Sequence, residues 1–315
     1  MTRDALRCTV NESVRGVWCA LLTPLDRSGG VASARMLAHA RRLLDEGVDG
    51  VAPFGTTGEG QSFSVAERID GLDALLAGGI PPSKILAATA CAALPDTVAL
   101  TRHAVAAGCI GALVLPPFFF KGIDDEGLYA SYAGLIDGVA DPRLRLYLYH
   151  IPQVTAVPVT PVVIARLRAA YPGVVEGLKD SAGDLAHSRA LAAQFRDLSV
   201  LVGHEPHLPA MLAAGGAGTV CGVANLDPRL VRRLFDTAGT AAGPDALAEM
   251  SNLLKILLDY PLLPAMKALQ ATLTGDEGWQ AVRPPLAPLA AGIRREMEDR
   301  LRRSGMIAAQ STSPR

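Results

Sequence analysis

The chain has 315 residues, of which 50% are hydrophobic, and its formal net charge is -1 at pH 7. The hydrophobic content allows a large core. The net charge excludes a strongly basic surface of the kind that attracts nucleic acid or an anionic membrane. The longest apolar stretch, CIGALVLPPFFF, is much shorter than the roughly 20 residues that a membrane span needs. The N-terminal segment lacks an apolar signal core, and the five cysteines are scattered, so we expect a cytoplasmic protein with reduced thiols.

Short β-rich runs alternate with helical patterns along the first 240 residues. Strands are expected at 17–24, 48–55, 85–90, 111–117, 145–152, 174–180, 199–205 and 218–225. Helices are expected at 33–46, 64–78, 94–108, 124–139, 160–173, 184–195, 207–216 and 227–239. Eight such units predict an α/β fold of the (β/α)8 TIM barrel type. An open doubly wound sheet is the alternative, but no G-x-G-x-x-G follows the first strand.

Three residues mark expected helix ends, and the strand and helix patterns divide the chain into four segments. Pro95 suits a first helical turn, Gly108 a helix end, and Thr160 an N-cap ahead of a proline. No strand pattern follows residue 240, where helices are expected at 244–259, 262–274 and 286–304. We therefore predict an N-terminal arm (1–15), a barrel (16–240), a C-terminal helical extension (241–305) packed on the barrel, and a flexible tail (306–315).

Lys179 is the sharpest chemical feature of the sequence. Only five of the 30 basic residues are lysines, so this chain uses arginine for most positive charges. Lys179 follows the apolar run VVEGL at the expected C-terminal end of the sixth strand, where catalytic groups of such barrels gather. Burial there favours the neutral, nucleophilic amine, which can form an imine with a ketone. The alternative is a structural salt bridge with Asp180 or Glu176.

Two further stretches end strands of the expected barrel. GTTGEG (55–60) combines glycines with two hydroxyls and could hold a carboxylate on its N–H groups, or it could be an ordinary glycine-rich turn. Tyr149 could transfer a proton to a substrate oxygen, or it could be a buried tyrosine with a satisfied hydroxyl. HEPH (204–207) hints at a metal, but no third ligand is evident, so we predict no metal site.

The order G-T-T-G-E, then Y-x-x-P, then G-x-K-D resembles the dihydrodipicolinate synthase / N-acetylneuraminate lyase family over about residues 15–300. The resemblance implies a class I aldolase that forms a Schiff base with pyruvate or another 2-oxo acid and needs no metal or organic cofactor. It also implies a homotetramer (a dimer of dimers) or a homodimer.

Carried over position by position, the resemblance assigns a role to each motif. Lys179 becomes the imine-forming lysine and Tyr149 the proton-transferring tyrosine, while Thr56 and Thr57 bind the carboxylate of the 2-oxo acid. The main chain of Val220 lines the pocket. The predicted substrate-binding set also contains Gly55, Phe119, Val154 and Glu205.

Two departures from the synthase pattern bear on the substrate. Phe119 stands where the synthase has a second tyrosine, and Val154 stands where it has an arginine that grips the aldehyde's carboxylate. We therefore predict a Schiff-base lyase or aldolase that cleaves or condenses pyruvate and an aldehyde, with a sugar-acid or hydroxy-oxo-acid substrate. The apolar PPFFF segment could even admit an aromatic or aliphatic aldehyde. The alternatives are 4-hydroxy-tetrahydrodipicolinate synthase, a catalytically impaired barrel that binds 2-oxo acids, and a metal-dependent aldolase. The aldehyde, the direction, and aldol cleavage against dehydration stay open.

Overall fold

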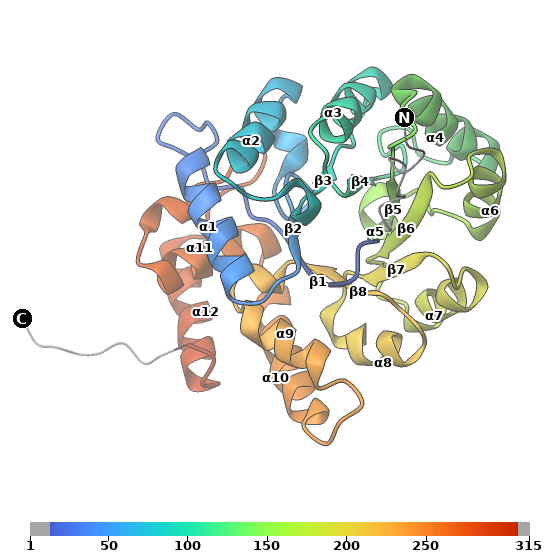
Figure 1. Ribbon diagram of the computed structural model, residues 1–315. Coiled ribbons are helices and arrows are strands. Elements are labelled where there is room, and N and C mark those ends of the chain that lie inside the picture. The colour runs from blue at the N-terminus through green and yellow to red at the C-terminus, as the bar shows by residue number, and fades with distance from the viewer. Residues whose placement is uncertain (1–12, 308–315) are drawn as a thin grey trace, which may run out of the picture.

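The computed structural model describes residues 13–307, and within them eight parallel strands form the wall of a barrel (Figure 1). The strands are β1 (Gly16–Ala20), β2 (Gly50–Ala52), β3 (Leu86–Ala88), β4 (Gly111–Val114), β5 (Leu146–His150), β6 (Val175–Asp180), β7 (Ser199–Val202) and β8 (Gly218–Cys221). β1 pairs with both β2 and β8, and a single bridge between Val51 and Ile85 joins β2 to β3. The predicted (β/α)8 barrel is confirmed, and the open sheet is excluded.

Helices surround the strands and continue beyond them (Figure 1). They are α1 (Ser33–Asp45), α2 (Val65–Ala77), α3 (Leu94–Ala106), α4 (Asp125–Val139), α5 (Pro152–Thr155), α6 (Pro161–Ala170), α7 (Leu185–Gln194), α8 (Leu208–Ala213), α9 (Pro228–Asp236), α10 (Gly243–Leu258), α11 (Leu262–Thr274) and α12 (Ala291–Arg303). Short 3-10 turns are η1 (Gly60–Ser62), η2 (Pro82–Lys84), η3 (Glu205–His207), η4 (Val223–Asn225) and η5 (Glu277–Gln280). Of the last three α-helices, α11 and α12 lie on the α1 side of the barrel, and α10 lies beside α9. None of the described helices is long and apolar enough to cross a membrane.

The helix signals read from the sequence act as expected. The Thr160 side chain accepts a hydrogen bond from the Val163 N–H, so it caps α6. Pro95 lies in the first turn of α3, and Gly108 follows that helix with a positive φ of 79°. The first twelve and last eight residues, which include most of the predicted arm and tail, lie outside the described residues.

Side chains from alternating strand positions fill the barrel, and glycines make room for the largest of them. Tyr147 is 1% exposed, and its ring lies where a side chain on Gly177 or Gly111 would have to go, 2.6 and 2.7 Å from an added Cβ. Gly50 leaves the same kind of space for Trp18. Because successive strand residues face opposite sides, Tyr149 must face the interior as Tyr147 does.

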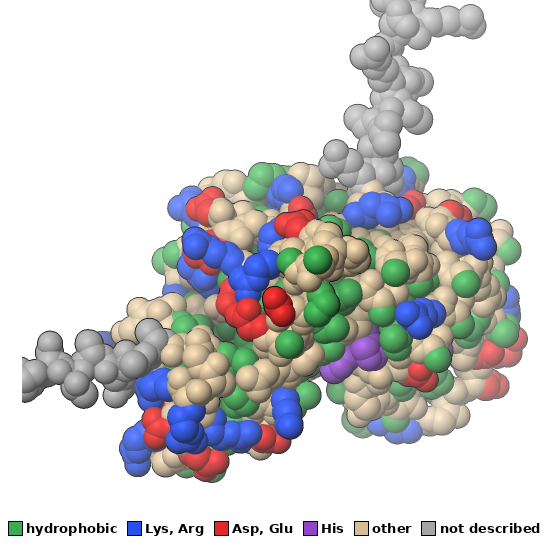
Figure 2. Space-filling view, turned by 90° about the horizontal axis from the view of Figure 1, so that it is seen from below, with side chains coloured by type: hydrophobic (Ala, Val, Ile, Leu, Met, Phe, Trp, Pro, Cys, Tyr) green, Lys and Arg blue, Asp and Glu red, His purple; other side chains and the backbone are tan. Residues whose placement is uncertain are grey.

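The surface carries charges of both signs. Acidic and basic side chains are interspersed over the face shown in Figure 2, and no broad area of one sign covers it. This agrees with the net charge of -1.

Candidate active site

Lys179 and Tyr149 form the centre of the site. They are register partners at the C-terminal ends of β6 and β5. The Lys179 Nζ lies 4.2 Å from the centroid of the Tyr149 ring, and each residue is only 4% exposed. The structure thus brings together the two predicted catalytic residues, from segments that are 30 residues apart in sequence.

The surroundings of Tyr149 make its hydroxyl easier to ionise. Burial by itself raises the pKa of the Tyr149 hydroxyl. The positive charge of Lys179 opposes burial, and so do hydrogen bonds with Ser181, Lys179 and Thr56. The net effect lowers the pKa of Tyr149 below the usual tyrosine value, which suits a group that exchanges protons.

Neither carboxylate that could have paired with Lys179 does so. Asp180 accepts hydrogen bonds from the His187 ring at 2.9 Å and from the Ser188 hydroxyl at 2.8 Å. Glu176 lies 3.6 Å from the Arg145 guanidinium. Among residues 13–307 no ion pair holds Lys179, so the salt-bridge interpretation of this lysine is not supported.

A buried acid and two thiols lie on the β8 side of Lys179. Glu205 is 4% exposed, and its Oε1 accepts a hydrogen bond from the Val223 N–H at 3.1 Å. Burial raises the pKa of Glu205, and the charge of Lys179 only partly offsets this. Burial likewise raises the pKa of the Cys19 and Cys221 thiols. These groups therefore favour their neutral forms beside the lysine.

The GTTGEG segment turns sharply at the end of β2. Phe54 and Glu59 both have left-handed backbones, with φ of 58° and 54°. An added Cβ on Gly60 would lie 1.8 Å from the Phe54 carbonyl oxygen, so only glycine fits there. Thr56, in the middle of this turn, is half-buried and interacts with the Tyr149 hydroxyl.

A buried ion pair fixes this turn from outside the barrel. The Glu59 carboxylate contacts the ammonium of Lys267 on α11, and both side chains are fully buried. The second Glu59 oxygen accepts a hydrogen bond from the Arg283 N–H at 3.1 Å, and Lys267 also donates to the Ala281 carbonyl. The C-terminal extension therefore holds the turn that carries Thr56. The sequence analysis missed this pair because its members are 208 positions apart.

A pocket of about 310 Å³ opens above the Lys179–Tyr149 pair. It is lined by Phe54, Gly55, Thr56, Glu59, Gly60, Gln61, Ser62, Ala88, Ala90, Leu113, Leu115, Phe118, Tyr149, Val154, Thr155, Leu263, Pro285 and Leu286. Its size is within the usual range for small-molecule sites, about 300–1,000 Å³. Four predicted site residues line it, namely Gly55, Thr56, Tyr149 and Val154.

The other predicted residues are not part of this lining, and Lys179 lies behind it, beside Tyr149. The Thr57 hydroxyl faces Gly222 after β8, and Val220 is fully buried in β8 opposite Trp18. Phe119 is 69% exposed and packs against Phe120 with ring centroids 5.2 Å apart.

The sequence analysis missed several residues of the site. Phe118, and not the predicted Phe119 beside it, lines the pocket. Leu263 and Leu286 come from the C-terminal extension, for which the sequence predicted only helices packed on the barrel. Ser181 was also missed, although it directly follows the lysine motif.

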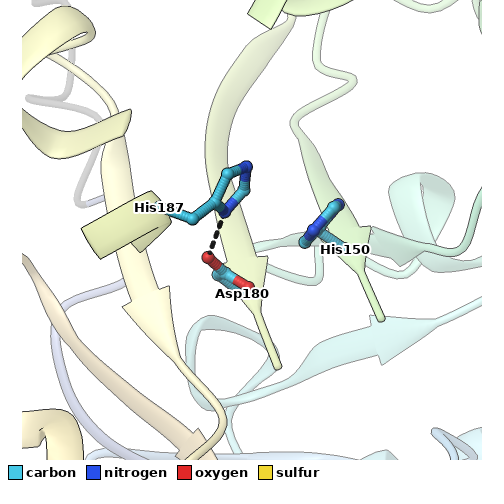
Figure 3. A group of neighbouring side chains, drawn as sticks. All are labelled: His150, Asp180 and His187. Atoms are coloured by element: carbon cyan, nitrogen blue, oxygen red, sulfur yellow. Dashed lines mark hydrogen bonds and ion pairs between the residues drawn. The ribbon is translucent and has the colours of Figure 1, made fainter. Parts of the chain in front are cut away.

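Figure 3 shows three neighbouring side chains, His150 on β5, Asp180 on β6 and His187 on α7. His150 and Asp180 directly follow Tyr149 and Lys179 in their strands and therefore face the opposite, outer side of the barrel wall. The His150, Asp180 and His187 ligand atoms all lie within 4.8 Å of one another, and the two rings stack with centroids 4.6 Å apart. The His150 Nδ1 accepts a hydrogen bond from the Val159 N–H at 3.0 Å. Asp180 is satisfied by the donors given above and by the Ala182 N–H. The group therefore acts as a hydrogen-bonded brace for the ends of β5 and β6.

HEPH does not add to this group. The His204 and His207 rings contact each other edge to face, with centroids 4.5 Å apart, while Glu205 bonds to the Val223 N–H. The two histidines and Glu205 thus do not form a candidate metal-binding group among the described residues.

Fold and site define the class: a (β/α)8 barrel with a buried lysine and a tyrosine at the C-terminal ends of neighbouring strands, beneath a small-molecule pocket. The model of the dihydrodipicolinate synthetase family matches residues 13–304. An uncharacterized DapA-like lyase of Chloroflexus aurantiacus is 40% identical over 281 residues, which cover 88% of this chain and 92% of that protein. The 4-hydroxy-tetrahydrodipicolinate synthase of Synechococcus sp. (strain CC9605) is 32% identical, with 89% and 92% covered.

The solved structures agree with this result. The crystal structure of dihydrodipicolinate synthase from Agrobacterium tumefaciens matches with a TM-score of 0.85 and 35% identity, over 92% of this chain and 99% of that one. The chain belongs to the dihydrodipicolinate synthetase family, and it is a lyase of that family.

Proposed function

We propose that this lyase forms a Schiff base between Lys179 and pyruvate, and joins pyruvate to an aldehyde or cleaves the corresponding 4-hydroxy-2-oxo acid. The single observation that carries the proposal is the position of Lys179, buried, without a carboxylate partner among the described residues, and 4.2 Å from the Tyr149 ring. A buried amine of this kind is a suitable nucleophile for a ketone.

The surrounding groups support each step. The Lys179 amine adds to the pyruvate ketone, the adduct loses water to form an imine, and Tyr149 accepts a methyl proton to leave an enamine. The enamine carbon attacks the aldehyde carbon while Tyr149 donates a proton to the aldehyde oxygen. Water then hydrolyses the imine and releases the product and free Lys179. In this proposal Thr56 and the N–H groups of the GTTGEG turn hold the pyruvate carboxylate.

Phe119 lacks the hydroxyl of the second synthase tyrosine, but its absence does not remove proton transfer from this site. The Tyr149 hydroxyl interacts with the hydroxyls of Thr56 and Ser181, which offer alternative relay partners. This favours an active lyase over an impaired barrel that only binds 2-oxo acids.

Exchange of the pyruvate methyl protons in D2O tests the proposal, because exchange requires the enamine but no aldehyde. Wild type should exchange the protons, as followed by proton NMR, and Lys179→Met should not. Lys255→Met is the matched control, since Lys255 is an exposed lysine on α10, away from the pocket lining. Exchange that survives in Lys179→Met would overturn the Schiff-base assignment.

A further inference from the structure

The outer half of the pocket is apolar. Side chains from four separate segments form it: Leu115 and Phe118 after β4, Val154 on α5, Leu263 on α11 and Leu286 before α12. Val154 is 55% exposed at the mouth. Tyr149 is 4% exposed, so a group attached to an aldehyde carbon beside Tyr149 would extend toward these more exposed side chains.

Three polar side chains of the wall are already bonded to the protein, whereas the Ser62 hydroxyl makes no hydrogen bond among the described residues. Gln61 donates to the Ala90 carbonyl at 2.8 Å, and the Thr155 hydroxyl donates to the Val157 carbonyl at 3.0 Å. Glu59 is paired with Lys267. A substrate with several hydroxyls would therefore lose its bonds to water and find few free partners here.

No lysine or arginine among residues 13–307 lines the pocket. Besides Lys179 and Lys267, three cations lie near it, and most of their donors are engaged. Arg283 bonds to the Ser62 carbonyl and to Glu67, and Arg68 bonds to the carbonyls of Ala88 and Ala90.

Lys121 lies closest to the mouth and contacts the carbonyls of Phe118 and Thr155, so it ties together the loops after β4 and β5. A carboxylate on the aldehyde would enter this wall without a free cation opposite it.

From this lining we infer that the aldehyde partner is uncharged and apolar, an aromatic or branched aliphatic aldehyde. The inference rests on the proposed function and deepens it. The new carbon–carbon bond forms between the pyruvate methyl carbon and the aldehyde carbon, the aldehyde oxygen becomes a hydroxyl, and no oxidant or reductant is needed. Of the predicted substrates, sugar acids and those hydroxy-oxo acids that carry a second carboxylate fit this wall less well, because they present additional hydroxyls or a second charge to it.

The test is a panel of aldehydes with saturating pyruvate. Benzaldehyde and isobutyraldehyde represent the apolar class, glyceraldehyde the hydroxylated class, and aspartate semialdehyde and glyoxylate the charged class. We expect kcat/KM for the better of the two apolar aldehydes to exceed kcat/KM for each hydroxylated or charged aldehyde by about tenfold or more. Faster turnover of a hydroxylated or charged aldehyde would overturn the inference, and so would no turnover of any aldehyde by an enzyme that still exchanges pyruvate protons.

Variants at the mouth sharpen the result. Val154→Arg should lower kcat/KM for benzaldehyde and raise it for aspartate semialdehyde, while Val154→Met, which lengthens the side chain without charge, should leave the order of the panel unchanged. If Lys121→Met alone abolishes use of a charged aldehyde that wild type prefers, Lys121 is the missing cation and the inference is wrong. If wild type does not exchange the pyruvate methyl protons at all, the proposed function is refuted, and the inference with it.

Discussion

Lys179 and Tyr149 are paired in register on β6 and β5, and the lysine ammonium lies 4.2 Å from the centre of the tyrosine ring. Because parallel strands keep their register, two inward-facing residues at the same level are held side by side by the backbone itself. The charge of Lys179 helps to lower the pKa of Tyr149, so the proposed nucleophile also tunes the proposed acid–base group.

Removing the Tyr149 hydroxyl should separate imine formation from the later proton transfer. Tyr149→Phe keeps the ring but loses the proton donor, and positioned acid–base groups typically contribute about 10²–10⁴-fold. We expect kcat to fall by about 100-fold or more, while the imine with pyruvate still forms and can be trapped by borohydride. If trapping and kcat fall together, the role of Tyr149 is to position Lys179, and proton transfer belongs elsewhere.

Gly203, just after β7, should tolerate no side chain. An added Cβ would lie 1.9 Å from the Ser181 hydroxyl and 3.1 Å from the Lys179 Cε. Overpacking of this kind costs about 1–3 kcal/mol and displaces the lysine stem. Gly203→Ala should therefore reduce kcat about tenfold or more, as measured by pyruvate consumption. Gly292→Ala is the control, because nothing lies within 4 Å of its added Cβ; equal activity of the two variants would contradict this account.

Lys267→Met should destabilise the protein strongly. It would leave the Glu59 carboxylate buried without its cation, and breaking such a pair typically costs about 3–5 kcal/mol. Urea denaturation should show this loss in the free energy of unfolding, and Glu59→Gln in the same chain should restore part of it. Lys255→Met, at an exposed position, should change stability by less than about 0.5 kcal/mol. A mild effect at Lys267, similar to that at Lys255, would mean that the pair is not buried as described.

His39 should make the protein less stable in mild acid. Burial lowers the pKa of His39 to about 4, while its Nε2 bonds to Asn225 at 3.0 Å. The unfolded chain binds this proton at about pH 6.5, so stability is full above that pH and falls as the pH drops toward 4. Between pH 7.5 and 5 the loss from this group should be about 2 kcal/mol.

His39→Gln should shrink this pH-dependent loss, whatever its effect at pH 7.5. Urea denaturation of both proteins at the two pH values measures the difference. An identical pH dependence in the two proteins would show that His39 is not held neutral.

The barrel and the catalytic pair could be predicted from the sequence because both depend on local signals. Each strand is an apolar run with its own bounding turn, and Lys179 and Tyr149 end two of them. The Lys267–Glu59 pair could not be predicted, because it depends on how the extension docks on the barrel. The start of α12 was placed too early, at 286 instead of Ala291, since Pro288 disfavours helix at the residue before it.

The pocket was only partly predictable for a related reason. Strand β4 ends at Val114, and the loop that follows has no period from which to tell which phenylalanine faces inward. The structure puts Phe118 on the wall and leaves Phe119 exposed. The homotetramer stays a prediction, which light scattering can measure.

Borohydride reduction in the presence of pyruvate is the most direct test of the central claim. The reduced imine is a stable secondary amine, so intact-mass and peptide mass spectrometry can locate it. The account predicts one reduced pyruvate for each chain, on the peptide that contains Lys179, and none in Lys179→Met. An unmodified chain, or an adduct on another lysine with Lys179 free, would contradict it.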